Sequence, residues 1–181
     1  MGNCVAACLS LFLSFVTPVF AETAHPGSKT LDIDPIAVVA QAQQDRGLVV
    51  QRAGHPTGLL PPERFAALAR ITQRVSFMTG NGEQQNEWTG PLLWTVLGAS
   101  GVIEGANQRE QAHLVVRVTG ADGYAAAIAL GEISPLLADR PILLADVLNG
   151  APLPDHALRL VVPGDRLGAR SVRDVVRIEI E

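Results

Sequence analysis

The residues best suited to chemistry in this 181-residue chain lie in a loop near its end, from Pro163 to Arg173. This loop reads PGDRLGARSVR and so combines two glycines with three arginines. Turns of this kind leave backbone N–H groups free to face a ligand, and the guanidinium group of arginine binds carboxylate and phosphate oxygens through paired hydrogen bonds. The loop therefore predicts a site for an anionic, phosphate-bearing ligand.

Strands on both sides of the loop must position it. The segments Ile142–Ala145, Leu158–Val162 and Asp174–Ile180 are rich in Val, Ile and Leu and read as strands. Between the first two, Asn149 and Gly150 form a dipeptide that tolerates positive φ at both positions, which a type I′ hairpin turn requires. The end of the chain is thus predicted to be a set of strands that carries the arginine loop.

The rest of the sequence predicts short elements of both kinds. Asp34 and Pro35 form a helix start signal, and Pro62 with Glu63 form another. The expected helices are Ile36–Asp45, Arg64–Arg70 and a turn at Ser134–Ala138; the expected strands are Leu48–Arg52, Val75–Met78, His113–Thr119 and Ala125–Leu130; Ala53–Pro62 is expected to be a loop. The fold class predicted is α+β, a mixed sheet with short helices.

Composition narrows the function classes. Hydrophobic residues make up 48% of the chain, so a packed domain is expected rather than disorder. The net charge of −4 argues against binding nucleic acid or an anionic membrane surface.

The chain begins with a segment typical of a secretory leader. Residues 1–21 contain an apolar run from Val5 to Phe20 and end in Ala21, with small residues where signal peptidase requires them. We expect a Sec-type signal peptide (1–21), an N-terminal segment with a short helix (22–46) and a folded domain (47–181), in the periplasm or secreted. Both cysteines, Cys4 and Cys8, lie in the leader, so no thiolate is expected in the mature protein.

Several motifs in one order resemble a known family. The motifs are Leu144-Ala145, Asn149-Gly150, Pro152-Leu153-Pro154, His156, Arg159, Val161-Val162-Pro163-Gly164 and Gly168-Ala169-Arg170-Ser171-Val172-Arg173. Together they resemble the molybdopterin-binding domain of the sulfite oxidase and assimilatory nitrate reductase family. The resemblance covers roughly residues 70–181 and implies a sulfite-oxidase-type fold with molybdopterin as the cofactor.

The resemblance assigns roles to residues near the metal. In the family, a strand ends in a cysteine that ligates molybdenum, followed by Ala-Gly-Asn; here Met78 stands in that place and Asn81 matches the asparagine. A thioether is a neutral, weak donor and cannot supply the charge of a thiolate, which makes molybdenum doubtful. Tyr124, the only tyrosine, matches a catalytic tyrosine of the family, although a structural tyrosine bonded to backbone remains an alternative.

The cofactor-binding residues implied by the resemblance are clustered near the arginine loop. They are Met78, Asn81, His156, Arg159, Arg170, Ser171 and Arg173. A lysine is more usual in the family where Arg173 stands, and the stretch between His156 and Arg159 is short. Solvated surface arginines remain the alternative to an anion pocket, and no metal ligand is predicted.

Three functions remain open at this stage. The favoured one is an exported, catalytically reduced or inactive relative of sulfite oxidase that binds a pterin-like or other small anionic ligand. The second is an active molybdenum-dependent oxidoreductase without a protein thiolate ligand. The third is a ligand-free periplasmic interaction or sensor-accessory module, whose partner would be a membrane redox or sensor protein.

Overall fold

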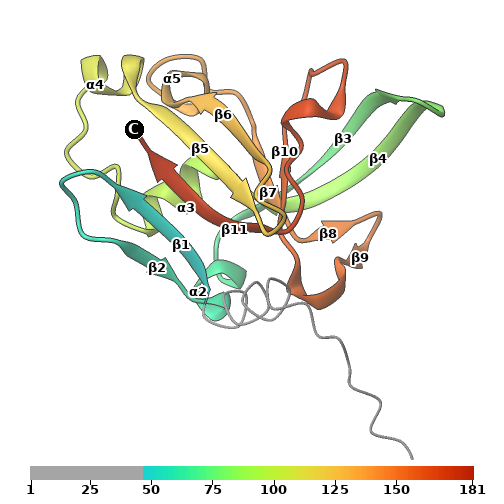
Figure 1. Cartoon of the computed structure of the whole chain (residues 1–181), viewed down its shortest axis with the longest axis horizontal. Coiled ribbons are helices and arrows are strands. Elements are labelled where there is room, and N and C mark those ends of the chain that lie inside the picture. The colour runs from blue at the N-terminus through green and yellow to red at the C-terminus, as the bar shows by residue number, and fades with distance from the viewer. Residues whose placement is uncertain (1–46) are drawn as a thin grey trace, which may run out of the picture. The chain divides into compact units, whose positions relative to one another are not determined.

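The structure, a computed structural model, describes residues 47–181 (Figure 1). The predicted signal peptide (1–21) and the expected helix Ile36–Asp45 lie outside the described residues. Element labels follow Figure 1, in which colour runs from blue at the N-terminus to red at the C-terminus.

The first layer is a five-stranded mixed sheet with the order β2-β1-β11-β5-β6. Its central strand, β11, pairs in parallel with β1 and antiparallel with β5. Buried residues alternate with outward ones along β5 and β11, as expected for a strand with one face in the core. The bounds are Leu48–Arg52 (β1), Gly58–Leu60 (β2), Val115–Gly120 (β5), Ala125–Ala129 (β6) and Val175–Ile180 (β11).

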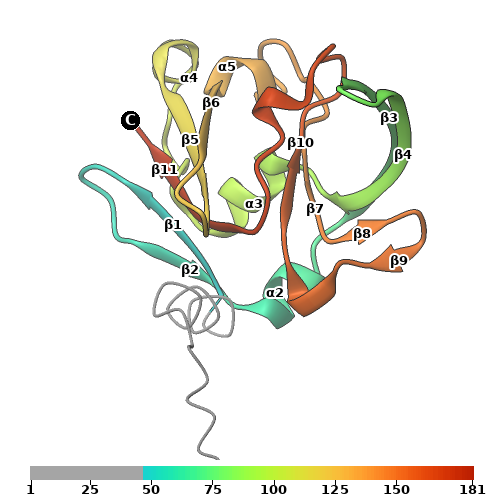
Figure 2. The ribbon, with the colours of Figure 1, turned by 45° about the vertical axis from the view of Figure 1, so that its right-hand side comes forward.

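A four-stranded antiparallel sheet has the order β3-β4-β8-β9, and a separate pair joins β7 to β10. β3 and β4 form a long hairpin that is paired from Arg70 with Pro91 to Thr79 with Gly82. Figures 1 and 2 both place β7 and β10 between the two larger sheets. The bounds are Arg70–Thr79 (β3), Gly82–Pro91 (β4), Leu143–Ala145 (β7), Val147–Leu148 (β8), Ala151–Pro152 (β9) and Arg159–Val161 (β10).

The helices of the described part are all short. α3 buries Leu93, Val96 and Leu97, the i, i+3, i+4 spacing of an amphipathic helix. α4 begins with a capping box, in which the Asn107 side chain accepts from the Glu110 N–H and the Glu110 side chain accepts from the Asn107 N–H. The bounds are Pro62–Ala66 (α2), Leu93–Ala99 (α3), Gln108–His113 (α4) and Leu130–Ile133 (α5), with 3₁₀ turns at Pro154–His156 (η1) and Gly168–Arg170 (η2).

The core consists of two clusters of buried side chains. The larger lies around the five-stranded sheet and α3, and the smaller includes Phe77 and Trp88 from the β3–β4 hairpin. β7 contributes to both: Leu144 belongs to the larger cluster, while Leu143 and Ala145 belong to the smaller. Neighbouring side chains on a strand point to opposite faces, so one face of β7 packs into each cluster and the strand connects the two.

The predicted turn at Asn149 and Gly150 is confirmed. Both have positive φ, +49° and +80°, as a type I′ turn requires. The turn connects β8 to β9, and Asn149 also accepts from the Glu87 N–H through its side chain. The strands predicted on either side of the arginine loop are confirmed as β7, β10 and β11, and the α+β class is confirmed.

Two segments near the start of the described part were predicted wrongly. The helix expected over Arg64–Arg70 ends at Ala66, and Arg70 begins β3, where it pairs with Pro91 and its guanidinium contacts Asp146. These contacts from distant parts of the chain outweigh local helix propensity. The loop expected over Ala53–Pro62 contains β2, which pairs with β1.

The strand β4 was not among the elements that the sequence predicted. Its residues before Trp88 are mostly exposed and polar, so no buried alternation marks it as a strand. Pairing with β3 along its whole length holds it extended. Similarly, the helical turn expected at Ser134–Ala138 is preceded by the helix α5, because Leu130 and Ile133 are the residues that pack into the core.

Candidate functional site

The arginine loop Pro163–Arg173 connects β10 to β11 and contains η2. Gly164, Arg166, Leu167, Gly168 and Ala169 are exposed. The loop contacts the end of β3, where the Met78 N–H donates to the Arg166 carbonyl oxygen at 2.9 Å. The loop is therefore an accessible segment that is held next to the strand on which Met78 lies.

Arg159 lies on β10 and is the most enclosed arginine of the site. Its Nε donates to Ser171 Oγ at 3.0 Å, and the Ser171 hydroxyl donates to the Leu160 carbonyl oxygen at 2.9 Å. The guanidinium carbon lies 5.4 Å from the centre of the Trp88 ring, a cation–π distance. With Nε bound to Ser171, the two terminal nitrogens form the edge that remains for a ligand.

The surroundings of Arg159 are short of negative charge. Burial lowers the pKa of its guanidinium, the nearby charge of Arg173 lowers that pKa further, and Asp174 acts in the opposite direction. The net shift is downward and burial is its largest cause, so the charged form of Arg159 is disfavoured where no carboxylate lies within 4.0 Å of it. An anion bound here would interact favourably with both arginines.

Arg170 is in a different position, because carboxylates already surround it. Its Nε and Nη2 donate to the two oxygens of Asp165 at 2.9 and 2.6 Å, and Nη1 lies 3.4 Å from Glu132, which also pairs with Arg140. The hydrogen bond to Asp165 is the main cause of the raised pKa of Arg170. This arginine therefore ties the loop to α5 rather than offering an open cationic edge.

Arginines without a carboxylate partner gather at this loop. Seven of the twelve arginines of residues 47–181 lie within 4.0 Å of a carboxylate oxygen: Arg52, Arg70, Arg74, Arg117, Arg140, Arg170 and Arg177. Of the other five, Arg64 and Arg109 lie elsewhere, and Arg159, Arg166 and Arg173 belong to the segment that forms β10 and the loop. These three arginines therefore concentrate positive charge in a chain whose net charge is −4.

Trp88 completes the inner wall of the site. Its indole Nε1 is buried and is the one such side-chain polar atom in residues 47–181 without a hydrogen-bond partner. Burying an N–H group without a partner costs free energy, on the order of 1–3 kcal/mol. The unpartnered N–H thus belongs to the side chain whose ring lies next to the Arg159 guanidinium.

Met78 and Asn81 lie at the tip of the β3–β4 hairpin. Met78 is 47% exposed and forms a parallel bridge with Leu167 of the arginine loop. Asn81 follows in the exposed turn between the two strands. The structure thus brings Met78 next to the loop that carries Arg166.

Tyr124 lies on the turn between β5 and β6. Its hydroxyl donates to the carbonyl oxygen of Ala169, in η2, at 2.5 Å. This contact brings Tyr124 together with the arginine loop, and it uses the hydroxyl proton that a catalytic role would need.

His156 lies apart from this cluster, in η1. It lines a cavity of about 220 Å³ whose walls are mostly apolar, with Leu60, Phe65 and Val176 among them. None of the twelve described arginines lines that cavity. The cavity thus offers little polar chemistry beyond His156 and Asp146.

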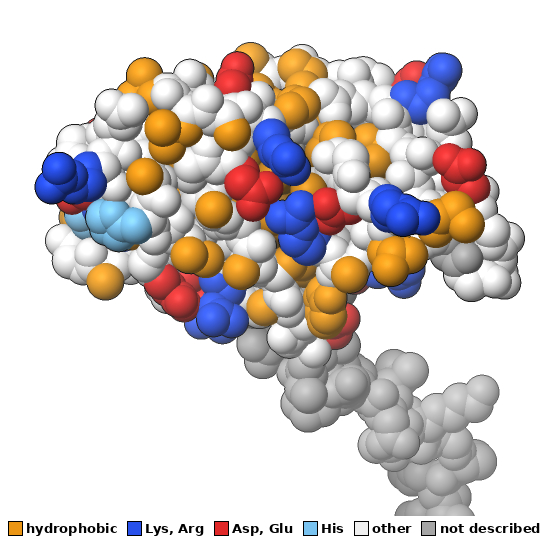
Figure 3. Space-filling view, turned by 90° about the horizontal axis from the view of Figure 1, so that it is seen from above, with side chains coloured by type: hydrophobic (Ala, Val, Ile, Leu, Met, Phe, Trp, Pro, Cys, Tyr) orange, Lys and Arg blue, Asp and Glu red, His pale blue; other side chains and the backbone are white. Residues whose placement is uncertain are grey.

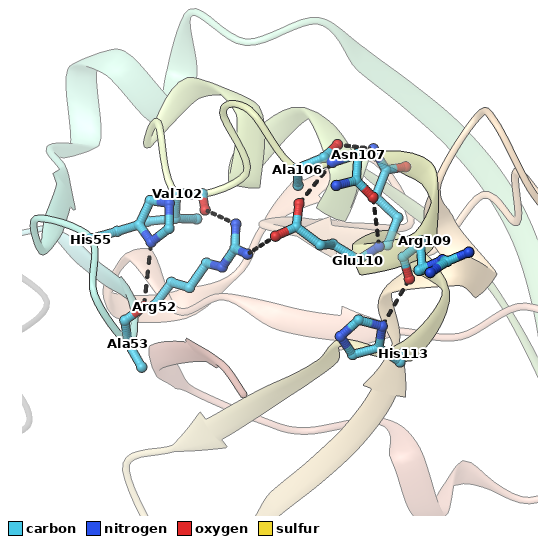
Figure 4. Close-up of polar contacts among 10 residues, drawn as sticks. Arg52, Ala53, His55, Val102, Ala106, Asn107, Arg109, Glu110 and His113 are labelled. Carbon is cyan, nitrogen blue, oxygen red and sulfur yellow. Dashed lines mark hydrogen bonds and ion pairs between the residues drawn. The ribbon is translucent and has the colours of Figure 1, made fainter.

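A further polar cluster, far from the loop in sequence, joins β1 to α4 (Figure 4). Arg52 donates to the Val102 carbonyl oxygen at 3.5 Å and pairs with Glu110 at 3.8 Å. His55 and His113 each donate through Nδ1 to a nearby backbone carbonyl. These contacts attach α4 to β1. In residues 47–181 there is no group of three or more His, Cys, Asp or Glu that could hold a metal ion.

Two members of the cluster were not among the predicted site residues. Arg166 belongs to the loop that the sequence singled out, but the motif positions passed over it. Trp88 has an ordinary interpretation as core packing, and its unpartnered N–H could be found only from the folded neighbours. The predicted roles of Met78, Asn81, Tyr124 and the others stay predictions.

Within residues 47–181 no helix is long and apolar enough to span a membrane. No curated protein matches the chain. Among solved structures, the sulfane dehydrogenase SoxCD from Paracoccus pantotrophus matches with a TM-score of 0.60 and 19% identity, over 76% of this chain and 38% of that chain. At that identity the likeness shows the fold alone, and this chain spans well under half of the matched one.

The family comparison is more specific. Residues 65–181 match the oxidoreductase molybdopterin binding domain, a range that contains the β3–β4 hairpin, Tyr124 and the whole arginine loop. The match covers more than half of the chain, and the structural likeness to SoxCD agrees with it. The chain therefore belongs to the family of oxidoreductase molybdopterin-binding domains of the sulfite oxidase type.

Proposed function

We propose that this protein is an exported, catalytically reduced or inactive member of the family that binds a pterin-like or other small anionic ligand. The observation that carries the proposal is the group Arg159, Arg166 and Arg173, which lack carboxylate partners within 4.0 Å in the described part of the chain. The free terminal edge of Arg159 would take two oxygens of a phosphate, and Arg173 would neutralise a second charge. A pterin bearing a phosphate group fits this arrangement.

The metal end of a molybdenum cofactor fits less well. The family supplies a cysteine thiolate where this chain has Met78, and a thioether brings no negative charge to a high-valent metal. The hydroxyl of Tyr124 is bonded to a backbone carbonyl, so it is not available to donate to a substrate in this arrangement. Both points favour binding without efficient catalysis, and we derive no redox step from these residues.

The expected route of export agrees with this reading. The leader predicted from residues 1–21 has no twin arginine, so we infer Sec-type export of an unfolded chain. Exported molybdenum enzymes usually acquire their cofactor before they cross the membrane in a folded state. A protein exported unfolded would have to bind its ligand in the periplasm.

Metal and pterin content would test the proposal directly. The mature protein should be purified from a host that makes and exports the cofactor, then analysed for molybdenum and for oxidised-pterin fluorescence. We expect pterin, or binding of added inorganic phosphate, with little molybdenum. Stoichiometric molybdenum with pterin would instead identify an active enzyme without a protein thiolate.

A Met78→Cys variant sharpens this test. If the pocket keeps the shape of the family site, restoring the thiolate should raise the molybdenum content of the purified protein. Met78→Leu serves as the matched control, because it removes the thioether without adding a ligand. Equal molybdenum in all three proteins would show that residue 78 does not face the metal position.

An interaction module is the second candidate. Met78, Tyr124 and Leu167 are 47%, 50% and 62% exposed, and all three contact or belong to the same loop region. Figure 3 shows one face on which basic and acidic side chains stand next to one another and hydrophobic side chains surround them. Exposed apolar residues beside cations suit a membrane redox or sensor partner with an acidic, partly apolar surface. Weaker binding of such a partner to a Leu167→Asp variant, in a protein that binds neither pterin nor phosphate, would support this ligand-free candidate.

A further inference from the structure

The turn that carries Tyr124 is a firm support. Backbone hydrogen bonds close it, from the Gly123 N–H to the Gly120 carbonyl oxygen and from the Gly120 N–H to the Tyr124 carbonyl oxygen. The Asp122 carboxylate accepts from the Tyr124 N–H at 2.9 Å. Both flanking strands, β5 and β6, are paired along their length in the main sheet. The backbone position of Tyr124 is thus fixed by the sheet.

The segment that Tyr124 contacts is held by few interactions. Gly168 and Ala169 of η2 are exposed, no buried side chain lies within that turn, and no side chain caps it. Further along the loop Val172 is fully buried in the larger core cluster, so it is η2 itself that is held by polar contacts instead of by apolar burial. Besides the Tyr124 hydroxyl bond to Ala169, these are the bond between Met78 and Arg166 and the carboxylates around Arg170.

η2 lies only a few residues before Ser171 and Arg173, so a displacement of η2 would move residues of the anion site. Ala169 is two residues before Ser171, whose hydroxyl receives the Nε–H of Arg159. Ser171 is buried and also donates to the Leu160 carbonyl oxygen, so its hydroxyl is committed on both sides. Arg173, the other cation near Arg159, follows two residues later.

We propose that Tyr124 is a positioning residue, which holds η2 through the Ala169 carbonyl and thereby sets the spacing of Arg159 and Arg173 for an anion. Its hydroxyl acts on the loop and does not donate to the ligand. This inference rests on the proposed anion-binding function, and it assigns to the only tyrosine of the chain a role other than catalysis.

The test compares Tyr124→Phe with Thr72→Val in the mature protein. The first removes the hydroxyl and keeps the ring. The second removes a side-chain hydroxyl from another exposed pair, Thr72 with Thr89, on the β3–β4 hairpin. Hydrogen exchange by mass spectrometry follows the loop amides, in particular those of Ser171 and Val172, which are hydrogen-bonded within the loop. Titration with inorganic phosphate follows the site.

For Tyr124→Phe we expect roughly 3- to 10-fold faster exchange in the loop and a similar loss of phosphate affinity, since the loop loses one ordinary hydrogen bond. Thr72→Val should match the wild type in both measurements. Unchanged loop exchange would overturn the proposal. So would weaker phosphate binding without faster exchange, which would mean that the hydroxyl contacts the ligand.

The proposed anion binding and the positioning role of Tyr124 can fail separately. If the wild type binds no phosphate and no pterin, the proposed function fails, and faster exchange in Tyr124→Phe would still show that the hydroxyl holds the loop. If phosphate binds and exchange does not change, only the positioning role fails. Hydrogen exchange outside the loop shows whether Tyr124→Phe is folded, so that a general loss of protection is told apart from the local change expected in the loop.

Discussion

Arg159 shows how one side chain can be prepared for a ligand by its neighbours. Ser171 fixes the Nε side, the Trp88 ring covers one face, and Arg173 places a second positive charge nearby. The terminal edge is left without a carboxylate in the described part. Because the side chain is already oriented, binding an oxyanion requires little further ordering.

Replacing Arg159 should therefore weaken anion binding more than replacing any exposed arginine. For Arg159→Gln we expect phosphate affinity to fall roughly 10- to 100-fold, since a charged hydrogen-bond donor is lost. Arg109→Gln is the control, because it removes an equally unpaired charge from α4. Isothermal titration of both variants checks the expectation. An equal loss in the two would mean that only the general charge of the protein matters.

At this scale the sequence singled out the loop where arginines without a carboxylate partner gather, but it did not distinguish the surroundings of each arginine. Arg159, Arg170 and Arg173 all occupied motif positions, yet Arg170 is enclosed by Asp165 and Glu132. Asp165 is close in sequence, whereas Glu132 comes from α5 and becomes a neighbour only in the folded chain. Motif spacing records residue types, and charge compensation depends on contacts that spacing does not contain.

Among the elements, β7 determines where the site lies. Its Ala145 pairs with Arg159 on β10, and its backbone lies against Gly90 on β4. A Cβ atom at Gly90 would lie 2.3 Å from the Leu144 carbonyl oxygen and 2.5 Å from the Ala145 Cα. A glycine is needed here for close approach, and the hairpin, β7 and β10 are stacked through that contact.

Gly90→Ala should therefore destabilise the fold and disturb the site together. We expect the free energy of unfolding to fall by about 3 kcal/mol, since backbone atoms have to move to admit the methyl group. Gly98→Ala is the matched control: it lies in α3 with open space around it and should stabilise by about 0.5–1 kcal/mol through helix propensity. Urea unfolding of both variants measures the difference. A stable Gly90→Ala would contradict the close packing of β4 on β7.

The elements that the sequence missed share a physical cause. β4 is polar and exposed over most of its length, and β3 begins at Arg70 because that residue contacts Pro91 and Asp146. β7 and β10 were predictable from short apolar runs, and β11 from its alternation of buried and outward-facing residues. Pairing with a distant partner, rather than local pattern, decides the others.

In the described part as a whole, the two core clusters are joined through β7 and β10. Leu143 and Ala145 face the smaller cluster and Leu144 the larger, and Leu160 and Val161 of β10 divide in the same way. Because β7 packs into both clusters, detaching β7 would expose apolar residues of both. We infer that residues 47–181 unfold as one unit.

Tryptophan fluorescence can test that inference. Trp88 belongs to the smaller cluster, whereas Trp94 packs against the larger, so a Trp94→Phe variant reports on the smaller cluster alone. We expect its fluorescence transition in urea to coincide with the far-ultraviolet circular dichroism transition, as two-state unfolding requires. A fluorescence midpoint at lower urea would show that the β3–β4 hairpin unfolds separately.

The central position of β11 has a consequence for how the protein is made. β1 leaves the ribosome early, yet its parallel partner is β11, and the side chains of Gln51 and Glu179 that meet across this pair are 128 residues apart. Until Val175–Ile180 has been synthesised, β1 and β5 have no common neighbour and the five-stranded sheet is open in its middle. The strand at the centre of this sheet is therefore the one that is synthesised last. A nascent chain of this kind stays unfolded through most of its translation, which gives targeting factors and chaperones a long period in which to engage it.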